Sequence, residues 1–550
     1  MLNQTPKKHF TLKLLMVLFL TATVSGCSQS ASSSKKQSNT SKNTITLMQT
    51  NELLSLDTSN HADLTTWNIL ENTMEGLYKA DSKHQPAPAM ATKVVSPTAN
   101  GTLYTFPLRH NAKWSNGDPV TAQDFVTAWQ RSVAPTAKSG YNYIFSGIKN
   151  ADAIIAGKKA PQTLGVKALG RYQLQVELEH PMPYFNKMMV MPAFFPENQT
   201  ALKKFGNNYG TNSQRLYYNG AFKATGWDGT NESWTLKPNK YYYDKKAIHL
   251  QAIKYLVVKD PNTAHELFEQ HKLDDATITG VTAKELQKDK NLIHQKRAGN
   301  YYLRINLANN QPLTNNNMRQ ALNLVLDRRA LTKDVLADGS VPAYTYTAKD
   351  LATDPTSGKD FASEHQPQQT YNVALARKLW QKGRSEAGLK KTVNLTLIGD
   401  DQTVTKNVAQ FVQASIQKNL PAVKVTMRNI PEKSASAAVK SGKFNLAQTL
   451  WLADFADPIS FMGILTKNNP QNYGKYNDDE FNQLYQAALE SSTSTNQYWQ
   501  NMNKLEERLN QTVPVLPLYQ MVESHLVNPR LHGVLSHPVG ENDYTRAYLK

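Results

Sequence analysis

The stretch Phe444–Pro458, FNLAQTLWLADFADP, is the part of the chain from which the rest can be interpreted. It begins as an apolar run of the length of a strand and ends with two aspartates three positions apart. Asp457 and Pro458 are typical of a helix start, because the carboxylate accepts free amide hydrogens and proline has a preset φ. The sequence indicates no capping role of this kind for Asp454. We expect it either to hold a cationic group away from water or to be a second cap or a surface turn.

Length and composition limit the possible classes of protein. A chain of 550 residues is too long for one core and should fold as two or more lobes. Its hydrophobic content of 40% is that of a globular protein. The net charge of +18 suggests an anionic neighbour, either nucleic acid or a cell envelope. We expect no nucleic-acid partner, because the lysines are scattered and no finger spacing or RNP-like motif is present.

The N-terminus indicates export. Lys7 and Lys8 precede the apolar run 14–24, which is short for a membrane span and has the build of a secretory signal. Small residues then precede Cys27, the only cysteine, in a pattern that resembles a bacterial lipobox. In that pattern Cys27 is diacylated; the alternative is an ordinary signal with an incidental cysteine. A single cysteine forms no internal disulfide, and acyl chains would supply an anchor. We predict a signal peptide at 1–26 and the lipidated cysteine with a flexible tether at 27–42.

Strands and helices alternate before the opening stretch. Val393–Ile398 and Val423–Arg428 are typical of strands, and Thr403–Leu420 is typical of a long helix between them. This alternation predicts a parallel α/β sheet in which Phe444–Leu452 is the next strand. Asp454 would then lie at the carboxyl end of a strand, where ligands of such sheets bind.

The remaining patterns predict further elements. Thr121 and Asp124 have the spacing of a capping box at a helix start. Met188, Met189 and Met191 could suggest soft-metal binding. Because no Cys or His is interleaved, they are interpreted as core filling. Other predicted elements are a strand at Thr44–Met48, helices at Trp67–Tyr78, Ala264–Asp275 and Met318–Arg328, and a new segment beginning at Tyr302.

Several separate motifs carry a resemblance to one family. They are Trp451–Phe455 (WLADF), Glu75–Tyr78 (EGLY), Trp114–Val126 (WSNGDPVTAQDFV) and Tyr217–Phe222 (YYNGAF). In chain order and from about Asn43 to the end, these motifs resemble the extracellular peptide-binding proteins of ABC importers, the large oligopeptide-binding type of solute-binding protein (family 5). The resemblance implies a two-lobed α/β, periplasmic-binding-protein-like fold (type II, the large cluster C) with a hinge and an inserted subdomain. The implied ranges are 43–79, 215–301 and 522–550 for lobe I, 80–214 for the inserted subdomain, and 302–521 for lobe II.

The resemblance also implies a function and a site. A monomer without cofactor would capture oligopeptides between the lobes and deliver them to an ABC permease of two transmembrane subunits and ATPases. It would be held by the lipid on Cys27 at the outer face of the cytoplasmic membrane. Asp454 would pair with the α-ammonium of the peptide, which is a charge-assisted contact. The other implied ligand-binding residues are Trp451, Ala453 and Phe455 from lobe II, and Asn219, Gly220 and Ala221 from lobe I.

Enzyme motifs are incomplete, so we predict no catalytic residues and no metal site. His265 and Glu266 are followed by His271, whereas a zincin needs its two histidines on one helical face as H-E-x-x-H. Ser415 and Lys418 form an S-x-x-K without the S-D-N and K-T-G elements of a serine hydrolase. Two alternatives stay open. One is a receptor for a signalling peptide or a binder of another solute such as a cell-wall fragment; the other is a surface hydrolase or adhesin.

Overall fold

The computed structural model describes residues 43–550, apart from 61–62, 138, 140, 309–311 and 492–493. The predicted signal peptide (1–26) and the tether (27–42) with Cys27 lie outside these residues. Over the described ranges, no helix combines the length and the apolar character that crossing a bilayer requires.

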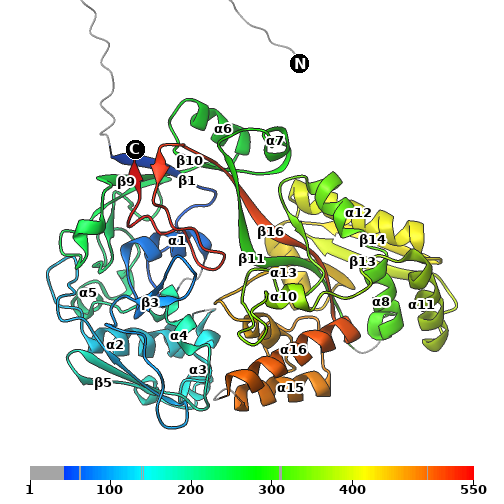
Figure 1. Cartoon of the computed structure of the whole chain (residues 1–550), viewed down its shortest axis with the longest axis horizontal. Helices are drawn as coiled ribbons and strands as arrows, with labels where there is room; N and C mark the ends of the chain where they lie inside the picture. Colours follow the sequence, from blue (N-terminus) through cyan, green and yellow to red (C-terminus); the bar gives the residue numbers. More distant parts are fainter. Residues whose placement is uncertain (1–42, 61–62, 138, 140, 309–311, 492–493) are drawn as a thin grey trace, which may run out of the picture. The chain divides into compact units, whose positions relative to one another are not determined.

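An 11-stranded sheet runs through the described part of the chain (Figure 1). Its strand order is β14, β13, β15, β11, β16, β10, β1, β9, β8 and β7, with β12 paired to β16. The bounds are β1 Thr44–Gln49, β7 Phe222–Thr225, β8 Ser233–Pro238, β9 Ala252–Val257, β10 Asp275–Ile278, β11 Leu292–Ile305, β12 Val341–Pro342, β13 Val393–Gly399, β14 Val423–Asn429, β15 Leu446–Leu452 and β16 Val515–Val527. The short strands β17 (Leu531–His532) and β18 (Tyr548–Leu549) form a separate pair.

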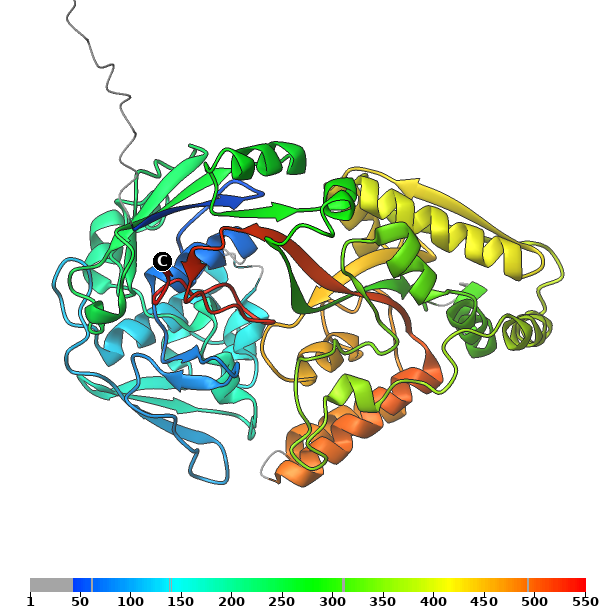
Figure 2. The same cartoon turned by 45° about the horizontal axis from the view of Figure 1, so that its top comes forward.

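The long strands β11 and β16 join the two ends of this sheet. They pair antiparallel and run side by side in both views (Figures 1 and 2). β10 pairs with one end of β16, whereas β15 pairs with the opposite end of β11. The register between β11 and β16 shifts between Lys296 and Asn300, which places a bulge at the middle of the pair.

The predicted lobe boundaries at 301/302 and 521/522 lie inside β11 and β16, so each strand extends into both predicted lobes. The exact lobe ranges stay a prediction. The expectation that Tyr302 begins a new segment is wrong, because Tyr302 continues a strand that starts at Leu292.

The predicted parallel region is confirmed. β13 pairs in parallel with β14 and with β15, and α12 (Thr403–Asn419) connects β13 to β14. Val408, Val412 and Ile416 of α12 are fully buried, as expected for the apolar face of a helix that covers a sheet. β15 starts two residues later than predicted, at Leu446.

The region predicted as an inserted subdomain contains its own three-stranded antiparallel sheet. The strand order is β4 (Leu103–Pro107), β6 (Gln173–Glu177) and β5 (Val166–Gly170), and a hairpin of β2 (Tyr78–Ala80) and β3 (Pro86–Pro88) precedes it. Helix α2 (Ala122–Val133) starts with the predicted capping box of Thr121 and Asp124. Met188, Met189 and Met191 are buried, which confirms their interpretation as core filling.

Two predicted helices have wrong bounds. α1 spans Leu64–Thr73 rather than 67–78, because Met74 is extended and Tyr78 begins β2. α6 spans Pro261–Glu269 rather than 264–275, because Asp260 caps its start and Asp275 begins β10. α8 spans Asn316–Leu324, so it starts two residues before the predicted range 318–328 and ends four residues before its end.

The other helices, all with at least four residues except α9, are α3 Ala151–Ile155, α4 Phe185–Met188, α5 Gln199–Phe205, α7 Gly280–Glu285, α9 Arg328–Ala330, α10 Phe361–Glu364, α11 Val373–Glu386, α13 Glu432–Lys440, α14 Ile459–Met462, α15 Asp479–Glu490 and α16 Thr495–Thr512.

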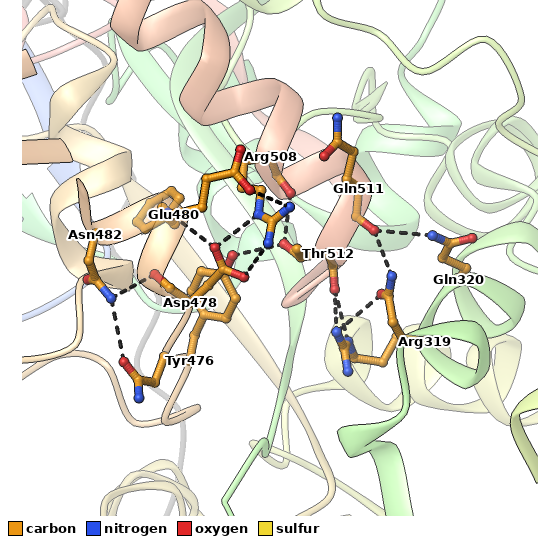
Figure 3. A network of polar contacts seen from close by, with 12 residues as sticks. Arg319, Gln320, Tyr476, Asp478, Glu480, Asn482, Arg508, Gln511 and Thr512 are labelled. Atoms are coloured by element: carbon orange, nitrogen blue, oxygen red, sulfur yellow. Dashed lines mark hydrogen bonds and ion pairs between the residues drawn. The ribbon is translucent and has the colours of Figure 1, made fainter. Parts of the chain in front are cut away.

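A polar network fixes the C-terminal end of α16 against α8 (Figure 3). Arg319 of α8 donates to the backbone carbonyls of Thr512, at 2.6 and 3.0 Å, and of Val513, at 3.0 Å. Arg508 of α16 donates to both carboxylate oxygens of Asp478, at 2.9 and 2.8 Å. Because β16 begins directly after this helix end, the network sets where the chain turns back toward the middle of the sheet.

Candidate functional site

The strand β15 has an open edge next to the predicted site. Its pairing with β13 covers only Leu446 and Ala447, whereas β11 continues along the other edge as far as Leu452. An extended ligand could therefore add to β15 beyond Ala447 by main-chain hydrogen bonds, as in strand addition to a sheet edge. The bulge of β11 supports this end of β15: a Cβ at Gly299 would lie 3.1 Å from the carbonyl oxygen of Trp451, so only glycine fits without a shift.

Asp454 lies directly beyond this strand and is held on two sides. Its backbone N–H donates to Ser460 Oγ at 2.8 Å, and the hydroxyl of Tyr141 donates to its carboxylate. Tyr141 packs edge-on against Trp67 of α1, with ring centroids 5.2 Å apart. Burial raises the pKa of the Asp454 carboxyl to about 7 although the Tyr141 hydrogen bond opposes the rise. The site therefore holds a carboxyl that would gain from a cationic ligand.

Asp457 is more than a helix cap. It accepts the N–H of Ile459 at 3.2 Å, but the N-cap of α14 is Pro458, so Asp457 lies one position before the cap and not at it as predicted. Its side chain, 3% exposed, also receives Lys187 Nζ of α4 at 2.9 Å and the hydroxyl of Tyr498. Asp457 thus joins the segment after β15 to the region predicted as the inserted subdomain.

Asp454 lines a cavity of about 80 Å³. Leu452 and Ala453 contribute to its wall from the site strand. Residues of α1 and of the segment after it form a second wall, and the C-terminal segment forms a third; these residues are Leu64, Trp67, Glu71, Met74, Glu75, Gly76, Tyr78, Lys79, Ala80, His537, Val539, Gly540, Glu541, Asp543 and Thr545. The remaining lining residues are Val190, Met191, Pro192, Phe195, Ala221 and Arg297. Parts of the chain far apart in sequence therefore share one cavity.

Of the three ligand-binding residues predicted from lobe I, Asn219, Gly220 and Ala221, one lines the cavity and two do not. Ala221 lines the cavity with Asp454. Asn219 is buried and accepts the N–H of Glu75 at 3.1 Å, while its amide donates to the carbonyl of Glu75 at 2.8 Å. Gly220 lies so close to Thr73 that a Cβ would be 2.5 Å from its carbonyl carbon. Asn219 and Gly220 therefore fix the end of α1, and Ala221 faces the cavity.

The aromatic residues on either side of Asp454 also differ. The indole of Trp451 donates to the carbonyl of Ser460 at 3.0 Å, so it braces the loop that carries Asp454. Phe455 stacks on Tyr184 with ring centroids 5.2 Å apart and lines a second cavity of about 30 Å³. Only Ala453, Asp454 and Ala221 of the predicted ligand-binding residues line the larger cavity.

The sequence did not reveal the partners of Asp454 and Asp457 or the roles of Glu71, Glu541 and Asp543 in the cavity. Tyr141 and Lys187 lie in segments where no local pattern marks them, and they reach the site by tertiary packing. Glu71 occupies a polar position in the predicted helix after residue 67, a spacing that could have identified it as facing away from the core. Glu541 and Asp543 lie in a short C-terminal stretch without periodic pattern.

His265 and Glu266 of the incomplete zincin motif lie in α6, and His271 follows the end of this helix. His265 Nε2 lies 3.9 Å from Glu269, its neighbour one turn along α6. Over the residues that the structure describes, no group of three or more His, Cys, Asp or Glu side chains is arranged to hold a metal ion.

Comparisons with known proteins give a consistent result. Residues 85–473 match the family model described as bacterial extracellular solute-binding proteins, family 5 Middle. A curated relative, the dipeptide-binding protein of Lactococcus lactis subsp. cremoris, is 32% identical over 91% of this chain and 93% of its own length. A second, the oligopeptide-binding protein OppA of Bacillus subtilis, is 31% identical over 99% of this chain and 100% of its own length.

A solved structure gives a similar match at the level of the fold. The pheromone receptor PrgZ, whose structure describes its mode of peptide binding, is 35% identical with a TM-score of 0.80 and covers 92% of this chain and 100% of its own.

Proposed function

The chain belongs to the bacterial extracellular solute-binding proteins of family 5, and from this premise we propose that it captures oligopeptides between its two lobes and delivers them to an ABC permease for uptake. One observation carries this proposal: the Asp454 carboxyl lies just beyond the open edge of β15 and lines a cavity. Main-chain pairing with β15 would bind any extended peptide, and Asp454 would bind the α-ammonium that all unmodified peptides share.

Each predicted ligand-binding residue has a role in this proposal. Asp454 takes the ammonium group, and Ala453 and Ala221 line the cavity beside it. Trp451 and Phe455 hold the loop of Asp454 through their contacts with Ser460 and Tyr184. Asn219 and Gly220 act indirectly, by fixing the end of α1 that forms another wall. We assign no catalytic step to any of them.

The names of the relatives support a peptide ligand. The curated relatives cited above are described as dipeptide- and oligopeptide-binding proteins, and this chain matches almost their whole length. A second function, reception of one signalling peptide, is favoured by the 35% identity to a pheromone receptor. The two functions differ in ligand range, because an importer binds many peptides and a receptor binds one or a few.

We further propose that the protein acts as a monomer held by diacylated Cys27 at the outer face of the cytoplasmic membrane. The support is the secretory pattern followed by small residues directly before Cys27, the only cysteine of the chain. The permease would consist of two transmembrane subunits and ATPases. Replacing Cys27 by serine should release the protein into the medium; retention of the variant in the membrane fraction would refute lipidation at this residue.

The proposed function is tested by thermal unfolding of residues 43–550 against a mixed library of short peptides and against their N-acetylated copies. A ligand that binds only the native state raises the midpoint. We expect free peptides of many sequences to raise the midpoint and acetylated copies to raise it much less. A response to a single peptide would favour the signalling receptor, and no response to any peptide would refute peptide binding.

A further inference from the structure

The cavity beside Asp454 is lined by more acidic than basic side chains. Its lining contains five carboxylic acids: Glu71, Glu75, Asp454, Glu541 and Asp543. Only two cationic side chains accompany them there, Lys79 and Arg297. The third basic residue of the lining, His537, is neutral near pH 7, because burial and the neighbouring His84 lower its pKa to about 4. The acids outnumber the cations in this lining.

The two cations are already used by other acids. Arg297 lies 3.3 Å from Glu541 and 3.3 Å from Glu523, and it also donates to the carbonyl of Gly540 at 2.9 Å. Lys79 lies 3.9 Å from Glu75. These pairs involve both cationic side chains of the lining. In the described part of the chain, neither cation forms an ion pair with Glu71 or Asp543.

Among the described residues, the hydrogen bonds to the carboxyl groups of Glu71 and Asp543 come from backbone N–H groups. Glu71 accepts the N–H of Glu541 at 2.9 Å, and Asp543 accepts the N–H of Thr545 at 2.7 Å. In the described ranges neither has an ion pair with a Lys, Arg or His side chain. Burying a carboxylate without a cation is costly, so a positive ligand beside Glu71 would stabilise its charged form.

Two acids of the lining, Glu71 and Glu75, have raised pKa values. Burial and the nearby Glu541 raise the pKa of Glu71 to about 8. Burial also raises the pKa of Glu75, which is 7% exposed, although Lys79 and hydrogen bonds from Tyr242 and Tyr243 oppose the rise. Both raised pKa values indicate that a cation in the cavity would stabilise the charged form of these carboxyl groups.

The rest of the lining is apolar. Leu64, Trp67 and Met74 come from α1 and its end, and Val190, Phe195 and Val539 come from other segments. An apolar wall with carboxyl groups matches a side chain that has an aliphatic stem and a cationic head. The Trp67 ring could also attract a cation. One water-sized group needs about 10–15 Å³ of such a volume. The cavity of about 80 Å³ therefore has room for about one side chain of this kind.

We propose that this cavity selects peptides with a lysine or arginine side chain near the free amino terminus, with Glu71 and Asp543 as the groups that recognise the cationic head. The inference rests on the proposed function, because Asp454 in the same cavity is the group that would hold the α-ammonium. The aliphatic stem of the ligand packs along the wall of α1, and its head lies toward the segment of Glu541 and Asp543.

The test compares peptides that differ only in charge. Calorimetric affinities are measured for Lys-Ala-Ala-Ala and Ala-Lys-Ala-Ala, for the same peptides with norleucine in place of lysine, and for Ala-Ala-Ala-Lys. Norleucine keeps the stem and removes the head. We expect one of the first two peptides to bind at least tenfold more tightly than its norleucine copy, and the distal lysine to give no such gain.

The protein variants identify the recognising groups. Glu71→Gln with Asp543→Asn keeps the hydrogen-bond acceptors for Glu541 and Thr545, and should reduce the lysine preference to about twofold without weakening norleucine peptides. Glu177→Gln removes a carboxylate from the exposed face of β6 and should leave the preference intact. A double variant that keeps the full preference would overturn the roles of Glu71 and Asp543.

Two failures are distinguishable. If norleucine and lysine peptides bind equally well to the unmodified protein, the selectivity inference falls and peptide capture stands. If none of these peptides binds, and the mixed library gives no response, peptide capture itself falls. A preference for glutamate at the same positions would contradict the inference directly.

Discussion

Lys187 Nζ lies 2.9 Å from Asp457 Oδ2, although 270 positions separate the two residues. The pair connects α4 to the segment that follows β15 and carries Asp454. Lys187 is about a quarter exposed, whereas Asp457 is almost fully buried. Removing the lysine would therefore leave a buried carboxylate with fewer partners, and the position of the Asp454 loop depends on that carboxylate.

Lys187→Met should destabilise the ligand-free protein. Leaving Asp457 without its cation should cost on the order of 1–3 kcal/mol, as is typical when a buried polar group loses its partner. A lower midpoint of thermal unfolding would be the sign. Adding Asp457→Asn should recover part of the loss, and Lys93→Met, at an exposed position, should have little effect. Equal midpoints for Lys187→Met and Lys93→Met would contradict this account.

Peptide affinity should depend on pH through Asp454. Burial raises the pKa of this carboxyl to about 7, so in the ligand-free protein it is mostly protonated below pH 7 and mostly charged above it. Because the α-ammonium favours the charged form, affinity for peptides with a free amino terminus should fall as the pH drops from 8 to 5. Calorimetry at several pH values measures this change.

Asp454→Asn is the matched variant for this dependence, because the amide oxygen can still accept the Tyr141 hydroxyl. It should bind free peptides roughly tenfold or more weakly at pH 8, in line with the loss of a charge-assisted contact. Its affinity should change less between pH 8 and pH 5. An unchanged affinity at pH 8 would remove Asp454 from the binding site without affecting the fold.

Binding of a lysine peptide should release protons. Glu71, with a pKa of about 8, is mostly neutral at pH 7, and a cationic head in the cavity would favour its carboxylate. The ratio of lysine to norleucine affinity should therefore rise from pH 6 to pH 9. Calorimetry in buffers with different heats of ionisation counts the protons released by each peptide.

Glu71→Gln should lower the number of protons released by lysine peptides and leave that of norleucine peptides unchanged. Glu75 and Glu541 also have raised pKa values, Asp543 is a further acid of the lining, and Arg297 and Lys79 are its cationic side chains. A residual release is therefore expected in the variant. Identical proton counts for the two peptides in the unmodified protein would argue against a cation beside Glu71.

Arg319 should be important for stability because it satisfies buried carbonyls. It donates to the carbonyls of Leu313 and Thr314 as well as those of Thr512 and Val513 at the end of α16. Arg319→Met would leave several of these acceptors unpaired, at about 1–3 kcal/mol for each that stays buried. The midpoint of thermal unfolding should drop clearly.

Gln320→Ala is the control for Arg319→Met. Gln320 is the next residue of α8 and donates to the carbonyl of Gln511, next to the acceptor of Arg319, but this hydrogen bond is exposed to solvent (Figure 3). Water can replace that bond, so we expect a change of less than about 0.5 kcal/mol. A drop as large as that of Arg319→Met would mean that burial of the acceptors is not the cause.

Local patterns in the sequence determined the elements around the site. Apolar periodicity and turn residues between positions 393 and 452 predicted the β13, α12, β14 and β15 succession and its parallel pairing, because such alternation allows few arrangements. The predicted end of α1 was wrong, since Gly76 and Tyr78 take their conformation from contacts with Phe195 and β3, which no local pattern contains.

The sequence by itself determined the family, the parallel sheet region and the position of Asp454 at the end of its strand, because these depend on residues close together in the chain. Only the tertiary structure decided which groups surround that carboxyl. Tyr141 reaches Asp454 across 313 positions, and Glu71, Glu541 and Asp543 meet in one cavity from opposite ends of the chain. A cation would stabilise the charged forms of these carboxyl groups because they are buried and close together. Burial and these distances exist only once the chain has folded.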